Sequence, residues 1–150
     1  MRFLDQHKVR YESHYYTETG AVSGMDVATV MGQDPDQVFK TLVTIGKTGQ
    51  YYVFVVPVNR DLDLRKAAVA VGEKSVAMIK AKELLPLTGY IHGGCSPIGM
   101  KKTFPTVIDT RARLQPAIIF SGGKIGYQVE LTLEELGKVL SFQIEDISDG

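Results

Sequence analysis

Residues 90–102 cannot form a regular helix or strand, and this constrains the fold more than any other stretch of the chain. They read Tyr-Ile-His-Gly-Gly-Cys-Ser-Pro-Ile-Gly-Met-Lys-Lys and hold three glycines, a proline and the single cysteine of the chain. Gly93 and Gly94 let the backbone take a positive φ or approach a ligand closely, and Pro97 fixes its own φ and lacks an N–H. Such a loop presents backbone amides that can hold an anion or an oxyanion.

A second glycine-rich segment, residues 121–126, reads Ser-Gly-Gly-Lys-Ile-Gly and has the same character. Two such loops predict a binding site whose walls are largely main chain. Charge is unevenly spread around them, although the formal net charge is zero. Residues 99–128 contain five lysines and arginines and one aspartate, whereas residues 129–150 contain six carboxylates and one lysine. The basic part either contacts an anionic partner or forms an ordinary solvated surface.

The composition indicates a single globular domain over residues 1–150. Hydrophobic residues make up 44% of the chain and charged residues 23%. No apolar run approaches the roughly 18 residues of a membrane-spanning helix. The first residues lack the apolar core of a secretion signal, so we expect a cytoplasmic protein without membrane contact. One cysteine excludes an internal disulfide, and the scattered histidines His7, His14 and His92 predict no metal site.

Hydrophobic periodicity and turn residues predict an α+β chain. Ser23, Asp63 and Thr132 are the expected helix N-caps, and Glu135 stands at the capping-box position of the last helix. The order of elements fits neither a doubly wound sheet nor an all-β sandwich. We expect a curled, mostly antiparallel mixed sheet or barrel with helices around it. The expected helices span residues 3–7, 23–31, 61–71, 80–85 and 132–140, and the expected strands span residues 9–16, 38–45, 51–58, 75–79, 106–109, 117–120, 127–131 and 142–144.

Two side chains on predicted strands are candidates for a binding site. Lys40 shares a strand face with Val38, Leu42 and Thr44, where an ammonium is costly unless it reaches water, an anion or a substrate. Lysines also protect sheet edges, and this alternative stays open. Tyr16 lies on the more polar face of the first strand, so it points into a polar site or is a half-exposed strand tyrosine.

The residues give little support to conventional nucleophilic catalysis. Cys95, Ser96 and Ser121 lie in the loops, but a serine or cysteine nucleophile needs a base within hydrogen-bond reach. His92 is three residues from Cys95 and is the only base that the sequence suggests for it. Neither loop has the spacing of a Walker A or a dinucleotide-binding motif, so no nucleotide cofactor is expected.

Five short segments resemble, in their order and spacing, those of the YbaK/EbsC family, and the resemblance covers residues 9–144. The segments are Val38-Phe39-Lys40-Thr41-Leu42, Thr88-Gly89-Tyr90, Gly93-Gly94-Cys95-Ser96-Pro97-Ile98-Gly99, Pro105-Thr106-Val107-Ile108-Asp109 and Ser121-Gly122-Gly123-Lys124. The family includes deacylases of Cys-tRNA(Pro) and the editing domain inserted in bacterial prolyl-tRNA synthetases. The resemblance implies a trans-editing enzyme that cleaves the ester between a wrongly attached amino acid and the 3′ end of tRNA.

The resemblance also implies roles for individual residues. Lys40 aligns with the family's most clearly required residue, so it is the expected catalytic residue. Tyr16 aligns with a tyrosine that lines the substrate pocket, and Gln128 stands where many relatives carry an aspartate. The residues that the resemblance implies for substrate binding are Tyr16, Gly93, Gly94, Cys95, Ser96, Gly99, Ser121, Gly122 and Gln128.

For the cysteine-specific members the resemblance implies a substrate-assisted reaction. The thiol of the bound cysteine attacks its own ester carbonyl, forms a thiolactone and releases tRNA. A free thiol has a pKa near 8.5, so roughly a few per cent is thiolate at neutral pH, and positioning within one molecule contributes the rest. We expect Lys40 to hold the terminal adenosine or its phosphate. We expect the amides of Gly94 to Ser96 to stabilise the carbonyl oxygen.

Other functions stay open at this point. A glutamine at position 128 offers only a dipole to the amino group of a substrate, so the chain could instead cleave Ala- or Ser-tRNA by water attack. It could also be a regulatory module that binds tRNA or a synthetase without turnover, or an unrelated hydrolase that uses Cys95. A near-neutral chain predicts weak tRNA binding by itself, and the family resemblance suggests prolyl-tRNA synthetase as a partner.

Overall fold

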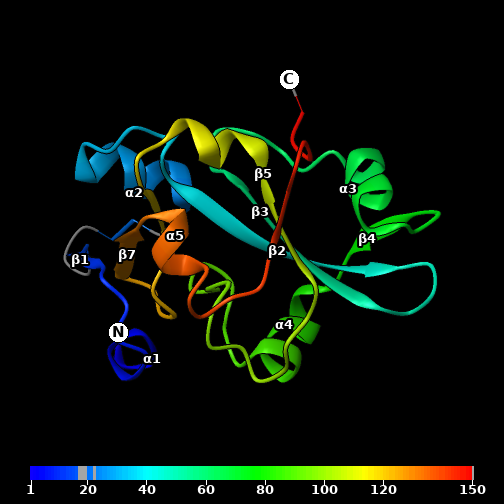
Figure 1. Cartoon of the computed structure of the whole chain (residues 1–150), viewed down its shortest axis with the longest axis horizontal. Helices are drawn as coiled ribbons and strands as arrows, with labels where there is room; N and C mark the ends of the chain where they lie inside the picture. Colours follow the sequence, from blue (N-terminus) through cyan, green and yellow to red (C-terminus); the bar gives the residue numbers. More distant parts are fainter. Residues whose placement is uncertain (17–19, 22, 150) are drawn as a thin grey trace.

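The strands of the computed structural model, which describes residues 1–16, 20–21 and 23–149, form two sheets (Figure 1). In the three-stranded sheet the order is β1-β7-β6, and both pairs are antiparallel. In the five-stranded sheet the order is β4-β2-β3-β5-β8. There β2 is antiparallel to β3 and β4, whereas β5 is parallel to β3 and β8. The strands span Glu12–Tyr15 (β1), Phe39–Gly46 (β2), Tyr51–Pro57 (β3), Val76–Met78 (β4), Thr106–Asp109 (β5), Ile118–Ser121 (β6), Tyr127–Leu131 (β7) and Gln143–Glu145 (β8).

The two sheets meet just before β2 begins, at a parallel bridge between Val38 and Ile119. The Ile119 amide also donates to the Gln37 carbonyl at 3.0 Å. The α+β class with mixed sheets is therefore confirmed. The strands divide into two sheets joined at this bridge, so the curled arrangement does not close into one barrel.

Two helices, α2 and α3, begin and end where their capping residues predict. Ser23 Oγ accepts the Asp26 amide at 3.2 Å, and Asp63 caps α3 through its carboxylate. Gly32 ends α2 with a φ of 65°, a conformation that favours glycine. No helix among the described residues is long and apolar enough to cross a membrane. The helices span Arg2–Gln6 (α1), Gly24–Met31 (α2), Leu64–Val71 (α3), Ala81–Thr88 (α4) and Leu133–Leu136 (α5), and a 3-10 helix spans Thr110–Leu114 (η1).

The fourth helix and the first strand differ in length from the expectation. α4 continues through Pro86 to Thr88, although proline lacks the N–H that the helical ladder uses. The Thr88 hydroxyl donates to the Leu84 carbonyl at 2.7 Å and adds a side-chain hydrogen bond to the last turn. The first strand covers only Glu12–Tyr15 of the expected residues 9–16.

The last helix is shorter than expected and ends at Leu136 rather than at residue 140. Thr132 caps it as predicted, but Glu135 accepts the Arg10 amide at 2.8 Å and so does not complete a capping box. Gly137 follows directly and disfavours a longer helix.

The centre of the core lies on β3, because both faces of the five-stranded sheet are covered. Val53 and Val55 pack in one cluster with side chains of β6 and β7. Phe54 and Val56 point to the opposite face and pack in a second cluster with α3. The five-stranded sheet is therefore a middle layer between α3 and the three-stranded sheet.

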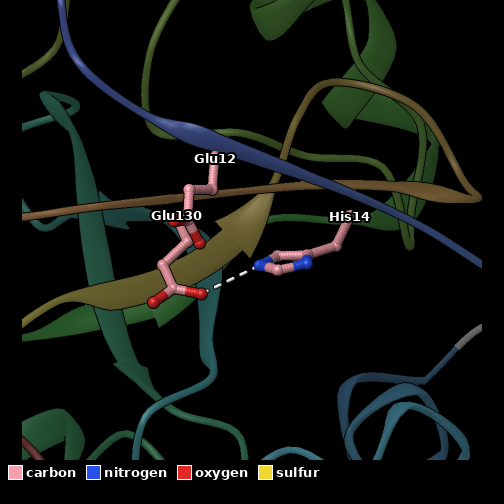
Figure 2. Close-up of side chains that lie close together, drawn as sticks. All are labelled: Glu12, His14 and Glu130. Carbon is pink, nitrogen blue, oxygen red and sulfur yellow. Dashed lines mark hydrogen bonds and ion pairs between the residues drawn. The ribbon is translucent and has the colours of Figure 1, made fainter.

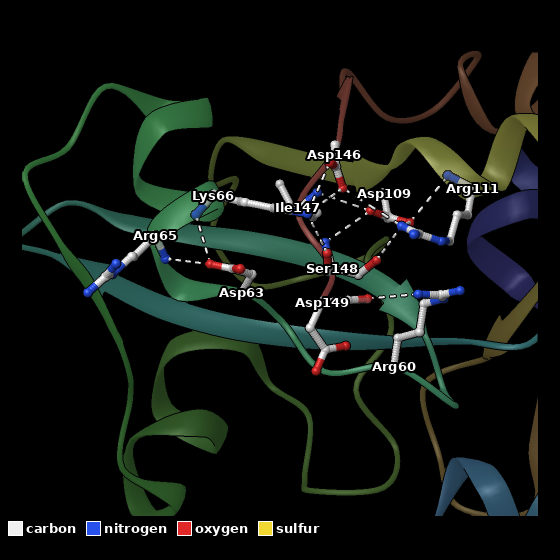
Figure 3. Close-up of polar contacts among 10 residues, drawn as sticks. All are labelled: Arg60, Asp63, Arg65, Lys66, Asp109, Arg111, Asp146, Ile147, Ser148 and Asp149. Carbon is white, nitrogen blue, oxygen red and sulfur yellow. Dashed lines mark hydrogen bonds and ion pairs between the residues drawn. The ribbon is translucent and has the colours of Figure 1, made fainter.

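A buried carboxylate anchors residues 146–149 to the end of β5 (Figure 3). Asp109 is fully buried, and its Oδ1 accepts the amides of Ile147 and Ser148 at 3.0 and 3.1 Å. Its Oδ2 accepts the Arg111 amide at 3.2 Å. One side chain therefore holds three main-chain donors from two separate segments.

Candidate functional site

A cleft with a volume of about 320 Å³ lies between α2, β2, β7 and the two glycine loops. Its wall is mostly apolar and comes from stretches of the chain that are far apart in the sequence. Lys40 is the only lysine or arginine among the described residues that line it, and no carboxylate is among them. Of the residues expected in a site, those that line the cleft are Tyr16, Lys40, Gly93, Cys95, Ser121 and Gln128.

Lys40 reaches the cleft from an inner strand of the five-stranded sheet. At Lys40 itself β2 pairs with β3, whereas the β4 pairing covers only Thr44 to Gly46 of the described residues, so the sheet-edge interpretation of this lysine stays open. Its Nζ lies 3.5 Å from Asp61 Oδ1, and the two side chains are 32% and 86% exposed. Asp61 is held in place by its carbonyl, which accepts the Asp149 amide at 3.0 Å. An ion pair with so exposed a partner is weak, so the amine can exchange it for a substrate anion.

Tyr16 and Gln128 form a buried part of the cleft, each 4% exposed. Tyr16 follows β1, and its amide donates to the Gly126 carbonyl at 2.9 Å. The half-exposed interpretation of this tyrosine is wrong. Gln128 lies on β7, and its Oε1 accepts from Gln33 Nε2 at 2.8 Å while its Nε2 donates to Gln33 Oε1 at 3.3 Å. Gln33 was not among the candidates, because a glutamine after a helix carries no distinctive pattern.

The two glycine loops pack against each other. A Cβ on Gly94 would lie 3.1 Å from the backbone of the second loop, so the main chains approach closely there. The Tyr90 hydroxyl donates to the Ile98 carbonyl at 2.6 Å and so stabilises the conformation of the first loop. A Cβ on Gly99 would lie 2.8 Å from this hydroxyl, and one on Gly123 would lie 3.0 Å from the Tyr90 ring. Several of the glycines therefore serve the packing of the loops.

Four of the expected binding residues do not themselves line the cleft: Gly94, Ser96, Gly99 and Gly122. Ser96 is fully buried, and its Oγ accepts the amide of Ile98 at 3.4 Å. A Cβ on Gly122 would overlap the ring of Tyr127. We therefore assign Gly94, Gly99, Gly122 and the side chain of Ser96 to the shape of the two loops.

The amides expected to hold an oxyanion differ in whether they already donate a hydrogen bond to another group of the protein. The Gly94 amide donates to the Ile91 carbonyl at 3.0 Å and is used within its own turn. The amides of Cys95 and Ser96 make no hydrogen bond within the described part of the chain. We therefore restrict the predicted oxyanion site to the amides of Cys95 and Ser96. Of these two residues, Cys95 lines the cleft.

Cys95 is poorly suited to act as a nucleophile. Its side chain is buried, and this burial raises the pKa of its thiol to about 12. The reactive form of cysteine is the thiolate, which such a pKa suppresses at neutral pH. His92 lines the same cleft, but no hydrogen bond joins it to Cys95 among the described residues. These observations speak against a Cys95-dependent hydrolase.

We expect Cys95 to react slowly with iodoacetamide in the folded protein. With the pKa of its thiol at about 12, alkylation at pH 8 should be on the order of 10³-fold slower than that of free cysteine. The rate should rise about tenfold per pH unit, because burial has moved the pKa above the tested range. The urea-unfolded chain is the control and should react like free cysteine. A plateau near pH 9 in the folded protein would contradict this expectation.

A second cluster of polar side chains, Glu12, His14 and Glu130, lies on the β1–β7 pair (Figure 2), and none of the three lines the cleft. His14 Nε2 lies 2.8 Å from Glu130 Oε1, and Glu12 stands directly opposite Glu130 in the strand register. Potential metal-ligand atoms of these residues all lie within 4.8 Å of one another. Sequence spacing did not predict this group, because it forms only across two strands. The His14–Glu130 contact joins β1 to β7, and Glu130 Oε2 accepts from Gln37 Nε2 at 3.5 Å, so we assign the cluster to the packing of these strands.

Comparison with known proteins decides what kind of domain carries this cleft. A family model described as an aminoacyl-tRNA editing domain matches residues 19–139. The chain belongs to the aminoacyl-tRNA editing domain family. This editing domain is 44% identical, over 99% of its length and 91% of the relative, to EbsC of Enterococcus faecalis, named a candidate Cys-tRNA(Pro)/Cys-tRNA(Cys) deacylase. The expected membership in the YbaK/EbsC family is thereby confirmed.

Longer proteins and solved structures resemble the editing domain as well. It is 26% identical to the proline–tRNA ligase of Thermosipho melanesiensis over 83% of its own length and 21% of that enzyme. A crystal structure of a candidate trans-editing enzyme for prolyl-tRNA synthetase superimposes with a TM-score of 0.84 and 25% identity, covering 99% of this chain and 94% of that one. A hypothetical protein of known structure has a TM-score of 0.89 at 20% identity over 99% and 97% of the two chains, and shows the fold alone.

Proposed function

We propose that this editing domain is a trans-editing deacylase that cleaves Cys-tRNA(Pro). The observation that carries the proposal is the cleft, in which Lys40 lies with the main chain of the first glycine loop while the only thiol, Cys95, is held protonated. A site of this kind can bind and polarise an ester without supplying an attacking group. The 44% identity to a candidate Cys-tRNA(Pro)/Cys-tRNA(Cys) deacylase supports the same substrate class.

The proposed reaction uses the thiol of the substrate itself. The cysteinyl sulfur attacks the ester carbonyl, so that an S–C bond forms and the C–O bond to the terminal ribose breaks. The thiol proton passes through solvent to the leaving ribose oxygen. The products are a cysteine thiolactone, which water then hydrolyses, and tRNA with a free hydroxyl. Holding sulfur and carbonyl in one bound molecule supplies the effective concentration that this step needs.

Each part of the cleft has a role in this proposal. The Lys40 amine exchanges Asp61 for a phosphate or the terminal adenosine of tRNA. The Cys95 and Ser96 amides stabilise the charge that develops on the carbonyl oxygen. Tyr16 and Gln128 contact the acyl group, and the apolar wall limits the access of water.

Deacylation of a panel of mischarged tRNAs tests the proposal. We expect rapid release of tRNA from Cys-tRNA(Pro) and resistance of Ser- and Ala-tRNA(Pro), because a hydroxyl or a methyl group cannot replace the thiol nucleophile. A transient thiolactone should be trapped by added hydroxylamine. Equal rates on the serine and alanine substrates would indicate water attack instead. Binding of tRNA without cleavage would indicate a regulatory module.

The proposed partners are the aminoacylated 3′ end of tRNA and prolyl-tRNA synthetase. Not all of the basic residues between positions 99 and 128 can contact tRNA, because the Arg111 guanidinium donates to Asp109 and, at 2.7 Å, to Ser148 Oγ. The remaining lysines and arginines are too few for tight binding to a phosphate backbone. A synthetase complex would add the missing recognition and would place the protein in the cytoplasm, where tRNA is charged.

A further inference from the structure

We propose that Gln33 is a positioning residue of the cleft, which fixes the amide of Gln128 and thereby sets how the cleft contacts the acyl group. This inference rests on the proposed deacylase function and adds a residue to it. Gln33 itself does not line the cleft, whereas Gln128 does.

The backbone of Gln33 is fixed by the end of α2. The Gln33 amide donates to the Ala28 carbonyl at 2.9 Å, and the Gly32 amide donates to the Thr29 carbonyl at 3.3 Å. These two bonds, with Gly32 in the left-handed conformation, form a Schellman motif, which satisfies the last carbonyls of a helix. The Gln33 side chain therefore starts from a defined place directly after the helix whose first turns line the cleft.

The side chains of Gln33 and Gln128 bond reciprocally and link α2 to β7. Each amide donates once and accepts once, at 2.8 and 3.3 Å. A glutamine amide has two N–H donors and an oxygen with two lone pairs. One N–H and one lone pair of Gln128 thus remain for a ligand. Because Gln128 is only 4% exposed, rotation of its amide away from Gln33 would leave polar atoms unpaired and is disfavoured.

Both side chains of the Gln33–Gln128 pair are neutral, so the pair brings no charge to this part of the cleft. No carboxylate is among the described residues of the cleft wall, so the amino group of an aminoacyl ester meets the Gln128 amide as a hydrogen-bond partner, without an opposite charge. A carboxylate at position 33 could not donate to Gln128 Oε1, and the two oxygens would repel each other. The reciprocal pair therefore requires an amide at both positions.

A double-mutant cycle on the deacylase activity tests the inference. Gln33→Met keeps the volume and removes both hydrogen bonds to Gln128, and we expect kcat/KM on Cys-tRNA(Pro) to fall about tenfold because the Gln128 amide is no longer held in one orientation. The same substitution in a Gln128→Met background should cost nothing further, because Gln33 acts through Gln128. Gln33→Glu should not restore activity.

Gln37→Met is the matched control. Gln37 lies on the same connection between α2 and β2, and its Nε2 donates to the Ala117 carbonyl at 3.0 Å. We expect its kcat/KM to stay within about twofold of that of the wild type. Multiplicative losses from Gln33→Met and Gln128→Met would overturn the inference, as would a loss that follows the melting temperature in all three variants.

An NMR measurement separates this inference from the proposed function. The side-chain amide signals of Gln128 should shift in Gln33→Met and stay in place in Gln37→Met, since only the former loses their hydrogen-bond partner. Unchanged Gln128 signals in Gln33→Met would overturn the inference whatever the activity. If the Gln128 signals shift in Gln33→Met but the wild-type protein is inactive on every charged tRNA, the proposed deacylase function is contradicted instead.

Discussion

Replacing Lys40 by alanine should abolish deacylation of Cys-tRNA(Pro), with kcat falling by roughly 10²–10³-fold or more. Lys40 is the only lysine or arginine of the cleft wall within the described residues, so its loss removes the charge that holds the anionic end of the substrate. The fold should be retained, because the side chain is 32% exposed and its ion-pair partner Asp61 is 86% exposed. Single-turnover deacylation assays together with circular dichroism would measure both effects.

Two further variants serve as comparisons for Lys40→Ala. Lys47→Ala changes an exposed lysine in the turn after β2 and should leave activity and stability unchanged. Lys40→Arg keeps the charge but replaces a compact ammonium by a planar guanidinium, so we expect only partial activity. Full activity in Lys40→Ala would exclude Lys40 from the reaction and, with it, the proposed role of the cleft.

Replacing Asp109 by alanine should lower the free energy of unfolding by about 3 kcal/mol. The carboxylate is fully buried and accepts the amides of Ile147, Ser148 and Arg111 at 3.0, 3.1 and 3.2 Å. Its removal leaves these donors without their acceptor in the interior. For a domain of this size the loss corresponds to a drop of about 6–12 °C in Tm. Urea and thermal unfolding would measure it.

Asp146→Ala is the control for this prediction. Asp146 lies in the same group of polar side chains and pairs with Lys66 at 3.0 Å and Arg111 at 3.7 Å, but it is 56% exposed (Figure 3). Solvent screens such pairs, so the loss should stay below about 1 kcal/mol. Equal destabilisation by the two substitutions would show that burial of the Asp109 carboxylate is not what anchors residues 146–149.

Local structure could be predicted wherever one residue marks the end of an element. Ser23 and Asp63 begin α2 and α3, and Gly32 ends α2, as their capping chemistry requires. The prediction failed at Pro86, where the missing N–H suggested a helix end. There Thr88 closes the last turn through the Leu84 carbonyl, a contact that residue propensities do not reveal.

Residues with a distinctive chemistry could be assigned to the cleft in advance. A lysine on an apolar strand face and a cluster of glycines are both unusual, and Lys40, Gly93 and Cys95 do lie together there. Gln33 and Asp61 could not be found in this way. Their residue types are common in loops, and their importance depends on the side chains that tertiary structure brings beside them.

The amino-acid sequence by itself determined the α+β elements, most of their ends and the two irregular glycine loops, because these depend on contacts between residues a few positions apart. Only the tertiary structure decided that the strands form two sheets, which glycines serve the packing of the loops, and which carboxylate anchors residues 146–149. The reason is physical: such features depend on pairs like Gln33 and Gln128, separated by 95 positions, whose contact follows from the packing of whole elements and leaves no local pattern.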